Sequence, residues 1–209
     1  MPKSKTWVVK LGGAMMRAPD LRQWLSACAE QNGEVRCVLV PGGGGFADQV
    51  RALQATWEFD DRVAHALAIE AMRMNAQVLQ ALLQAPCLSS DFAEIAGGTE
   101  KRYTAIWTPR PGMTIDGLPE TWEVTSDSIA LHVAHRIQAD ALLLVKSVDA
   151  SLLTSGTAAQ MSLQGLIDDF FPRLLARYPL PTMLVSKRQH VEFNDAVRSG
   201  QLFGARVDP

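Results

Sequence analysis

The sequence predicts an α/β fold in which a mostly parallel sheet is covered by helices on both faces. Short apolar runs alternate with segments of helical spacing along the chain, which is the pattern of parallel sheets with crossover helices. The apolar runs before the glycine turns read as strands buried on both faces. Since 209 residues suffice for one domain with a full core, we expect a single domain over residues 1–209.

The first part of the chain alternates strand and helix. We expect strands over residues 6–11 and 35–40, and helices over residues 18–32 and 46–57. A long helix should then begin at a cap supplied by Asp60 or Asp61 and run to about residue 84, before Pro86. Its apolar positions are Val63, Leu67, Met74, Val78 and Leu82.

The same long helix carries more apolar surface than one core requires. We expect Met72 and Met74 to fill the core, with a ligand role or a subunit interface as the less favoured alternatives. The excess apolar face indicates a homodimer or a larger homo-oligomer.

The second part of the chain is weakly patterned before it becomes regular. Short strands and loops are expected over residues 87–123, where glycines and prolines interrupt the apolar pieces. Residues 125–127 can open a helix that reaches Ile137 and is followed by a buried strand over residues 141–145. Further helices are expected over residues 162–178 and 189–199, and further strands over residues 182–185 and 203–207.

Composition and charge favour small-molecule chemistry. The net charge is −2 and the basic residues are scattered, so nothing indicates binding to nucleic acid or to an anionic membrane. Cys28, Cys37 and Cys87 lack metal-type spacing and lie in apolar surroundings, so we expect buried thiols and no protein-held metal. No signal peptide or spanning segment is visible, and we therefore expect a cytoplasmic protein.

A run of four glycines is the most informative segment. Gly42, Gly43, Gly44 and Gly45 join an apolar strand to an amphipathic helix. Residues without Cβ let backbone N–H groups approach an anion, and the following helix directs its positive end to the same place. A flexible surface turn is less favoured, because flexible linkers are polar on both sides. The segment therefore predicts a phosphate-binding loop.

Two further strands end in residues suited to anions. Ligands of parallel sheets bind beyond the carboxyl ends of the strands. Lys10 precedes Gly12 and Gly13 at one such end, and Lys146 closes another, followed by Ser147 and Asp149. Together these groups predict a site for several phosphates, although each lysine taken alone is equally well read as a surface side chain. Asp127 taken alone is explained as a first-turn partner of a helix dipole.

Two common nucleotide motifs fit poorly. The P-loop pattern fails, because no lysine follows the glycines. Gly42-x-Gly44-x-x-Ala47 satisfies a loose dinucleotide pattern, but Asp60 and Asp61 open a helix where that pattern requires the end of a strand. A dinucleotide oxidoreductase is therefore a disfavoured alternative.

Four ordered segments resemble the amino acid kinase superfamily. They are VVKLGG (8–13), VPGGGGFA (40–47), TSDSIA (125–130) and ADALLLVKSVD (139–149), and their order and spacing match over about the first 150 residues. The resemblance implies a three-layer αβα sandwich and transfer of the γ-phosphoryl group of ATP to a carboxylate, a phosphate or a similar acceptor. Residues 65–72 and 122–128 look most like the small kinases of methanofuran biosynthesis, which convert an aminomethylfuran methyl phosphate to its diphosphate.

The resemblance also implies roles for individual residues, with ATP and Mg²⁺ as the donor. Lys10 would stabilise the transferring phosphoryl group and Asp127 would orient Lys10, while Gly12 and Gly13 would line the donor phosphates. The residues expected on the acceptor side are Gly42, Gly43, Gly44, Gly45 and Ser126, with Arg62 and His65 as candidate contacts that are equally well read as ordinary residues of a helix face.

The chain departs from the family on the donor side. No Gly-Gly-Met segment with a lysine follows Asp149, and Ala150 stands where a glycine is expected. Lys146 and Lys187 are the candidates to replace the missing lysine, and Ser147 and Asp149 are expected near the nucleotide with them. These departures keep open a non-catalytic alternative, in which the chain binds phosphate or nucleotide as a sensor, a storage protein or a partner subunit.

Overall fold

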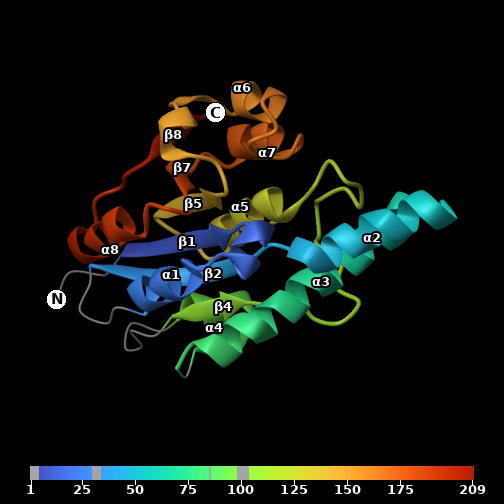
Figure 1. Cartoon of the computed structure of the whole chain (residues 1–209), viewed down its shortest axis with the longest axis horizontal. Helices are drawn as coiled ribbons and strands as arrows, with labels where there is room; N and C mark the ends of the chain where they lie inside the picture. The colour runs from blue at the N-terminus through green and yellow to red at the C-terminus, as the bar shows by residue number, and fades with distance from the viewer. Residues whose placement is uncertain (1–4, 30–33, 85, 98–103) are drawn as a thin grey trace.

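The computed structural model of the chain describes residues 5–29, 34–84, 86–97 and 104–209 (Figure 1). Its sheet has eight strands in the order β3-β4-β2-β1-β5-β7-β8-β6. Neighbouring strands are parallel except for the antiparallel pair of β7 and β8. The strands are β1 Lys5–Leu11, β2 Val35–Pro41, β3 Cys87–Ser89, β4 Ala105–Trp107, β5 Ala141–Lys146, β6 Gly156–Thr157, β7 Thr182–Ser186 and β8 Ala205–Asp208.

Helices connect these strands and cover the sheet. They are α1 Leu21–Cys28, α2 Gly44–Trp57, α3 Asp61–Leu82, α4 Phe92–Ala96, α5 Ser126–Arg136, α6 Ala158–Leu163, α7 Phe171–Arg177 and α8 His190–Ser199, with 3₁₀ turns η1 Gly13–Arg17 and η2 Ala150–Leu152. Figure 1 shows α2 and the long α3 side by side at one end of the sheet. No helix in the described ranges is both long and apolar enough to span a bilayer.

The strand residues divide between two cores, one on each face of the sheet. Val8 and Leu142 pack in one core with apolar residues of α5 and α7. Their neighbours Val9 and Leu143 pack in the other core with residues of α1 and α8. Successive strand residues point to opposite faces, so this division requires helices on both sides. The predicted three-layer arrangement is confirmed.

One predicted helix is wrong. Residues 162–178 do not form a single helix, because α6 ends at Leu163 and α7 begins at Phe171. Gly165 lies between them at φ +68°, a left-handed conformation that ends a helix and favours glycine. Pro172 then occupies the first turn of α7, where its missing N–H costs nothing.

Other boundaries also moved. The helix predicted over residues 18–32 is α1, preceded by η1, and the predicted end near residue 32 lies outside the described residues. The helix after the glycines begins at Gly44 rather than at residue 46. The cap of α3 is as predicted, since the side chain of Asp60 accepts from the N–H of Val63 at 2.8 Å.

The buried face of α3 is not the stripe that the sequence singled out. Ile69, Met72 and Leu79 are buried, which confirms the core position of Met72. Met74 is 36% exposed, so its prediction as a core residue is wrong. It shares an exposed stripe with Val63, Leu67 and Val78. The helix is apolar on two sides, and periodicity alone does not tell which side faces the sheet.

Candidate active site

The two glycine turns touch each other. β1 and β2 are parallel neighbours, with Leu11 opposite Pro41, so both strands end at the same edge of the sheet. A Cβ on Gly13 would lie 2.5 Å from Cα of Gly44, and Gly44 has φ +54°. Both the close approach and the left-handed backbone therefore demand glycine. The turns, predicted separately, form one surface.

Asn75 of α3 fixes the glycine loop from behind. This side chain is buried, and its Nδ2 donates to the carbonyl oxygens of Gly42 and Gly43 at 2.7 and 2.9 Å. The first-turn N–H groups of a helix have no acceptor within the helix, so the start of α2, which lines a cavity, is suited to an anion. Sequence reasoning missed Asn75, whose signal is a single amide within an apolar helix face.

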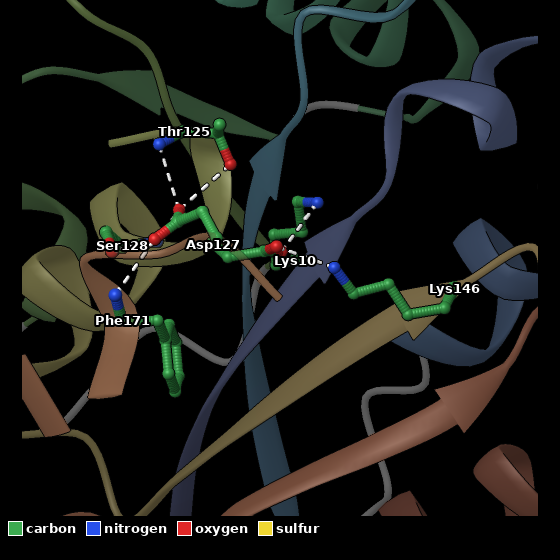
Figure 2. Close-up of polar contacts among 7 residues, drawn as sticks. Lys10, Thr125, Asp127, Ser128, Lys146 and Phe171 are labelled. Atoms are coloured by element: carbon green, nitrogen blue, oxygen red, sulfur yellow. Dashed lines mark hydrogen bonds and ion pairs between the residues drawn. The ribbon is translucent and has the colours of Figure 1, made fainter. Parts of the chain in front are cut away.

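Asp127 lies between two lysines, as Figure 2 shows. Its Oδ1 is 2.8 Å from Nζ of Lys10, and its Oδ2 is 2.6 Å from Nζ of Lys146. The side chains are 6%, 6% and 14% exposed for Asp127, Lys10 and Lys146. Lys10 and Lys146 sit near the ends of the adjacent strands β1 and β5, and Asp127 lies in the first turn of α5.

The electrostatics of this cluster keep Asp127 ionised. Burial alone would raise the pKa of Asp127, but the charges of Lys10 and Lys146 lower it to about 2. Burial lowers the pKa of Lys146, and the neighbouring Asp127 opposes that shift. The three side chains carry one positive charge in excess. Fixed positive charge in a water-poor site is what stabilises the oxygens of a transferring phosphoryl group.

The structure separates the two candidate lysines of the donor side. Lys146 contacts Asp127, whereas Lys187 follows β7 and is joined to Lys146 through its backbone N–H, which donates to the carbonyl of Lys146 at 2.8 Å. No ion pair connects Lys187 with Asp127 in the described part of the chain. Lys146 is therefore the lysine at the cluster.

Of the remaining residues predicted on the donor side, the structure brings Gly12 close to this cluster. The N–H of Gly12 donates to the carbonyl of Val145 at 3.2 Å, and a Cβ on Gly12 would lie 3.9 Å from Nζ of Lys10. Ser147 is exposed. Asp149 is also exposed and accepts from the N–H and Oγ of Ser151 at 3.0 and 2.8 Å, so it caps the turn that follows.

A cavity of about 510 Å³ opens beside the glycine loop. It brings together the predicted residues Gly43, Gly44, Gly45, His65 and Ser126, and its wall includes Gly13. Its other lining residues are Ala14, Arg17, Ala47, Asp48, Arg51, Ala68, Ile69, Met72, Trp122, Val124, Thr125 and Ile129. Gly42 is not among the lining residues.

The two helix residues proposed as substrate contacts differ in position. His65 is buried, and its Nδ1 lies 3.1 Å from the carbonyl oxygen of Thr121, to which it donates. Burial lowers the pKa of His65, so the ring is neutral at pH 7 and carries its proton on Nδ1. The side chain of Arg62 is 80% exposed, pairs with Glu120 at 3.0 Å and does not line the cavity.

Two arginines of the cavity were missed by sequence reasoning. Arg51 lies with its guanidinium carbon 3.6 Å from the ring centre of Trp122, whose Nε1 donates to Gln54 at 2.6 Å. Arg17 packs so closely on Gly45 that a side chain there would collide with it. Each arginine is one polar residue in an ordinary amphipathic segment, so only the fold reveals that both face the same cavity.

The fold and the two-lysine site are suited to phosphoryl transfer, and the comparisons with known proteins give the class. A sequence profile of the Amino acid kinase family matches residues 5–151, and the chain belongs to this family. It is accordingly a small-molecule kinase, and the family implies ATP as the phosphoryl donor.

The relatives in sequence are kinases of small phosphorylated molecules. The chain is 26% identical over 191 residues to (5-(aminomethyl)furan-3-yl)methyl phosphate kinase of Methanocaldococcus jannaschii, covering 87% of this chain and 88% of that protein. It is 28% identical over 152 residues to uridylate kinase of Methanospirillum hungatei, covering 69% of this chain and 60% of the relative.

The solved structures support the same fold. Uridylate kinase of Archaeoglobus fulgidus superimposes with a TM-score of 0.70 at 18% identity, covering 97% of this chain and 99% of that one. UMP kinase of Bacillus anthracis gives a TM-score of 0.72 at 15% identity, covering 98% and 96%.

Proposed function

We propose that this kinase phosphorylates the phosphate group of an aminomethylfuran-type phosphomonoester to give a diphosphate. An oxygen of the acceptor phosphate bonds to the γ-phosphorus of ATP, the bond to the β,γ-bridging oxygen breaks, and ADP leaves. The observation that carries the proposal is the placement of Asp127 between Lys10 and Lys146, next in the chain to Ser126, which lines the cavity with the glycine loop. The acceptor is suggested by the relative from M. jannaschii.

On the donor side, the two lysines would neutralise charge that develops on the γ-phosphoryl oxygens. Asp127 holds both ammonium groups in place, and the turn at Gly12 and Gly13 would let the phosphates approach the backbone.

Mg²⁺ would arrive with ATP, bound by phosphate oxygens and water, since it is commonly held by few protein ligands. Within the described residues, no group of three or more His, Cys, Asp or Glu side chains is arranged to hold a metal. We place the reaction in the cytoplasm, because ATP is supplied there.

On the acceptor side, the cavity offers matching chemistry for each part of such a molecule. Backbone N–H groups at the start of α2 and the guanidinium groups of Arg17 and Arg51 would bind the phosphate. Apolar side chains, including Ile69, would contact the furan ring, and the carboxylate of Asp48 would pair with the ammonium group. An acceptor phosphate is already anionic, so the transfer requires no general base.

An ADP-release assay with ATP–Mg²⁺ tests the function. The acceptors are the aminomethylfuran phosphate, its analogue without the amine, UMP and a simple alkyl phosphate. We expect turnover to be fastest with the first compound and to fall below detection in Lys10→Ala. Lys5→Ala is the matched control, because Lys5 begins the same strand and instead donates to the carbonyl of Gly200 at 2.7 Å. ATP binding without turnover of any acceptor would refute the kinase and favour a non-catalytic subunit.

We further propose that the protein is a dimer through an apolar surface on α2 and α3, called here the α2–α3 stripe. It consists of Phe46, Leu53, Trp57, Val63, Leu67, Met74 and Val78, which are all at least 36% exposed. Exposed apolar residues gathered on two adjacent helices are typical of an interface. Light scattering after gel filtration should show a dimer that Leu67→Glu converts to monomer. Gln77→Glu, also on the exposed side of α3, should leave the dimer intact.

A further inference from the structure

A second carboxylate, Asp168, lies behind the two-lysine cluster and accepts five hydrogen bonds. Its Oδ2 accepts from the N–H and Oγ1 of Thr125, both at 2.9 Å, and from the N–H of Ser128 at 3.0 Å. Its Oδ1 accepts from Oγ of Ser128 at 2.5 Å and from the N–H of Phe171 at 3.0 Å. Figure 2 shows these donors around the start of α5 and at the start of α7.

Asp168 therefore caps α5 from a distant part of the chain. The first N–H groups of a helix need acceptors from outside the helix, and Thr125, the residue at the cap position, makes no side-chain cap bond of its own. Asp168 supplies the acceptor although it lies 40 residues beyond Ser128. Its bond to Phe171 fixes α7 to the same carboxylate, so the two helix starts are joined.

The turn that Asp168 holds is the turn that builds the active site. Thr125 and Ser126 line the acceptor cavity. Asp127, between the two residues bonded to Asp168, contacts both lysines at 2.6 and 2.8 Å. A shift of this turn by about 1 Å would lengthen those contacts beyond hydrogen-bond distance.

Resting on the proposed kinase function, we propose that Asp168 is a positioning residue that acts through Asp127 to set the two lysines for phosphoryl transfer. Capping alone needs one acceptor oxygen, which Asn and Ser also supply, whereas here both oxygens of Asp168 accept hydrogen bonds. Burial and the nearby charge of Asp127 raise the pKa of Asp168, so a second carboxylate here is electrostatically unfavourable. Its charge also favours the protonated form of Lys146.

Asp168→Asn tests the proposal, because it keeps the shape of the side chain while removing the charge and one acceptor. We expect kcat to fall about 10²-fold, as misplacement by about 1 Å can do, with the Kd for ATP changed less than about threefold. Amide hydrogen exchange at Thr125 and Ser128 should accelerate. Asp169→Asn is the matched control, because Asp169 accepts only from Oγ of Ser162 among the described side chains and should leave kcat unchanged.

A double-mutant cycle separates positioning from plain stabilisation. If Asp168 acts through Asp127, Asp168→Asn should lower kcat by less than about threefold in an Asp127→Asn background. Equal losses in both backgrounds would mean that Asp168 acts independently of Asp127, and would overturn the proposal. Full activity of Asp127→Asn would instead refute the proposed site.

A readout independent of turnover uses the lysines themselves. Nζ of Lys10 is shielded by its pairing with Asp127, and its side chain is 6% exposed. Acylation of Lys10 by an amine-reactive ester, followed by mass spectrometry, should be at least tenfold faster in Asp168→Asn than in Asp169→Asn. Equal rates would refute positioning even if no acceptor were turned over, whereas failure of all acceptors alone would refute only the kinase function.

Discussion

Lys146→Met tests whether Lys146, rather than Lys187, replaces the lysine that is missing on the donor side. Methionine keeps the length and apolar stem of the side chain but removes the charge 2.6 Å from Oδ2 of Asp127. Loss of one preorganised charged or hydrogen-bonding group from a transition state costs about 3 to 4 kcal/mol in typical enzymes. We therefore expect kcat to fall about 10²- to 10³-fold.

Stability should change far less than activity. The pKa of Asp127 is about 2 in the folded protein against an ordinary 3.8, so ionised Asp127 contributes about 2 kcal/mol to folding at neutral pH. Only the share supplied by Lys146 is lost in the variant. That loss is offset because the ammonium of Lys146, whose pKa burial lowers, no longer has to be buried. The net change should be within about 1 kcal/mol.

The assay measures kcat and KM by ADP release, together with the free energy of urea unfolding. Lys187→Met is the matched control, because Lys187 is also partly buried and follows the adjacent strand β7. It should retain at least about one third of the wild-type kcat. If Lys187→Met loses as much activity as Lys146→Met, or if Lys146→Met is fully active, the assignment of Lys146 to the phosphoryl group is wrong.

Three further outcomes follow from the geometry. Asn75→Leu leaves two loop carbonyls without their donor and should cost about 2 kcal/mol in urea unfolding while raising the acceptor KM. Arg17→Gln should raise the acceptor KM about tenfold with kcat within about twofold, and an unchanged KM would remove Arg17 from the phosphate site. Burial and the charge of Arg136 lower the pKa of His132 to about 4 from 6.5. The unfolded chain thus binds this proton first, so stability should fall by about 2 to 3 kcal/mol from pH 7 to pH 4.5, and His132→Gln should flatten that decline.

The parts of the fold that sequence patterns predict are those governed by local rules. The strands over residues 6–11 and 35–40 were found because apolar runs ended in glycine, and the start of α3 was found because Asp60 can cap it. The helix predicted over residues 162–178 failed because the helical spacing masked a break at Gly165. The buried side of α3 was misjudged because both of its sides are apolar, and only packing against the sheet decides between them.

The residues of the candidate site also fall into two groups, those that local patterns predict and those that only the fold brings together. Lys10, Lys146 and the glycine loop follow apolar strands, so the rule that ligands bind beyond strand ends brings them together. Arg17, Arg51, Asn75 and Asp168 follow no strand end and carry no motif. Each acts across the fold, as the contact of Asn75 with Gly42 across 33 residues illustrates, so no local pattern marks it.

The two helix N-termini beside the site differ in what occupies them. The N-termini of α2 and α5 both present N–H groups that have no acceptor within their own helix, and such groups attract anions. The start of α5 already holds the carboxylate of Asp168, whereas the start of α2 opens on the cavity. On the proposed function, an acceptor phosphate would bind at the glycine loop, while the filled turn of α5 presents Asp127 to the lysines. One helix N-terminus would thus bind the anion of the substrate, whereas the other binds a carboxylate of the protein itself.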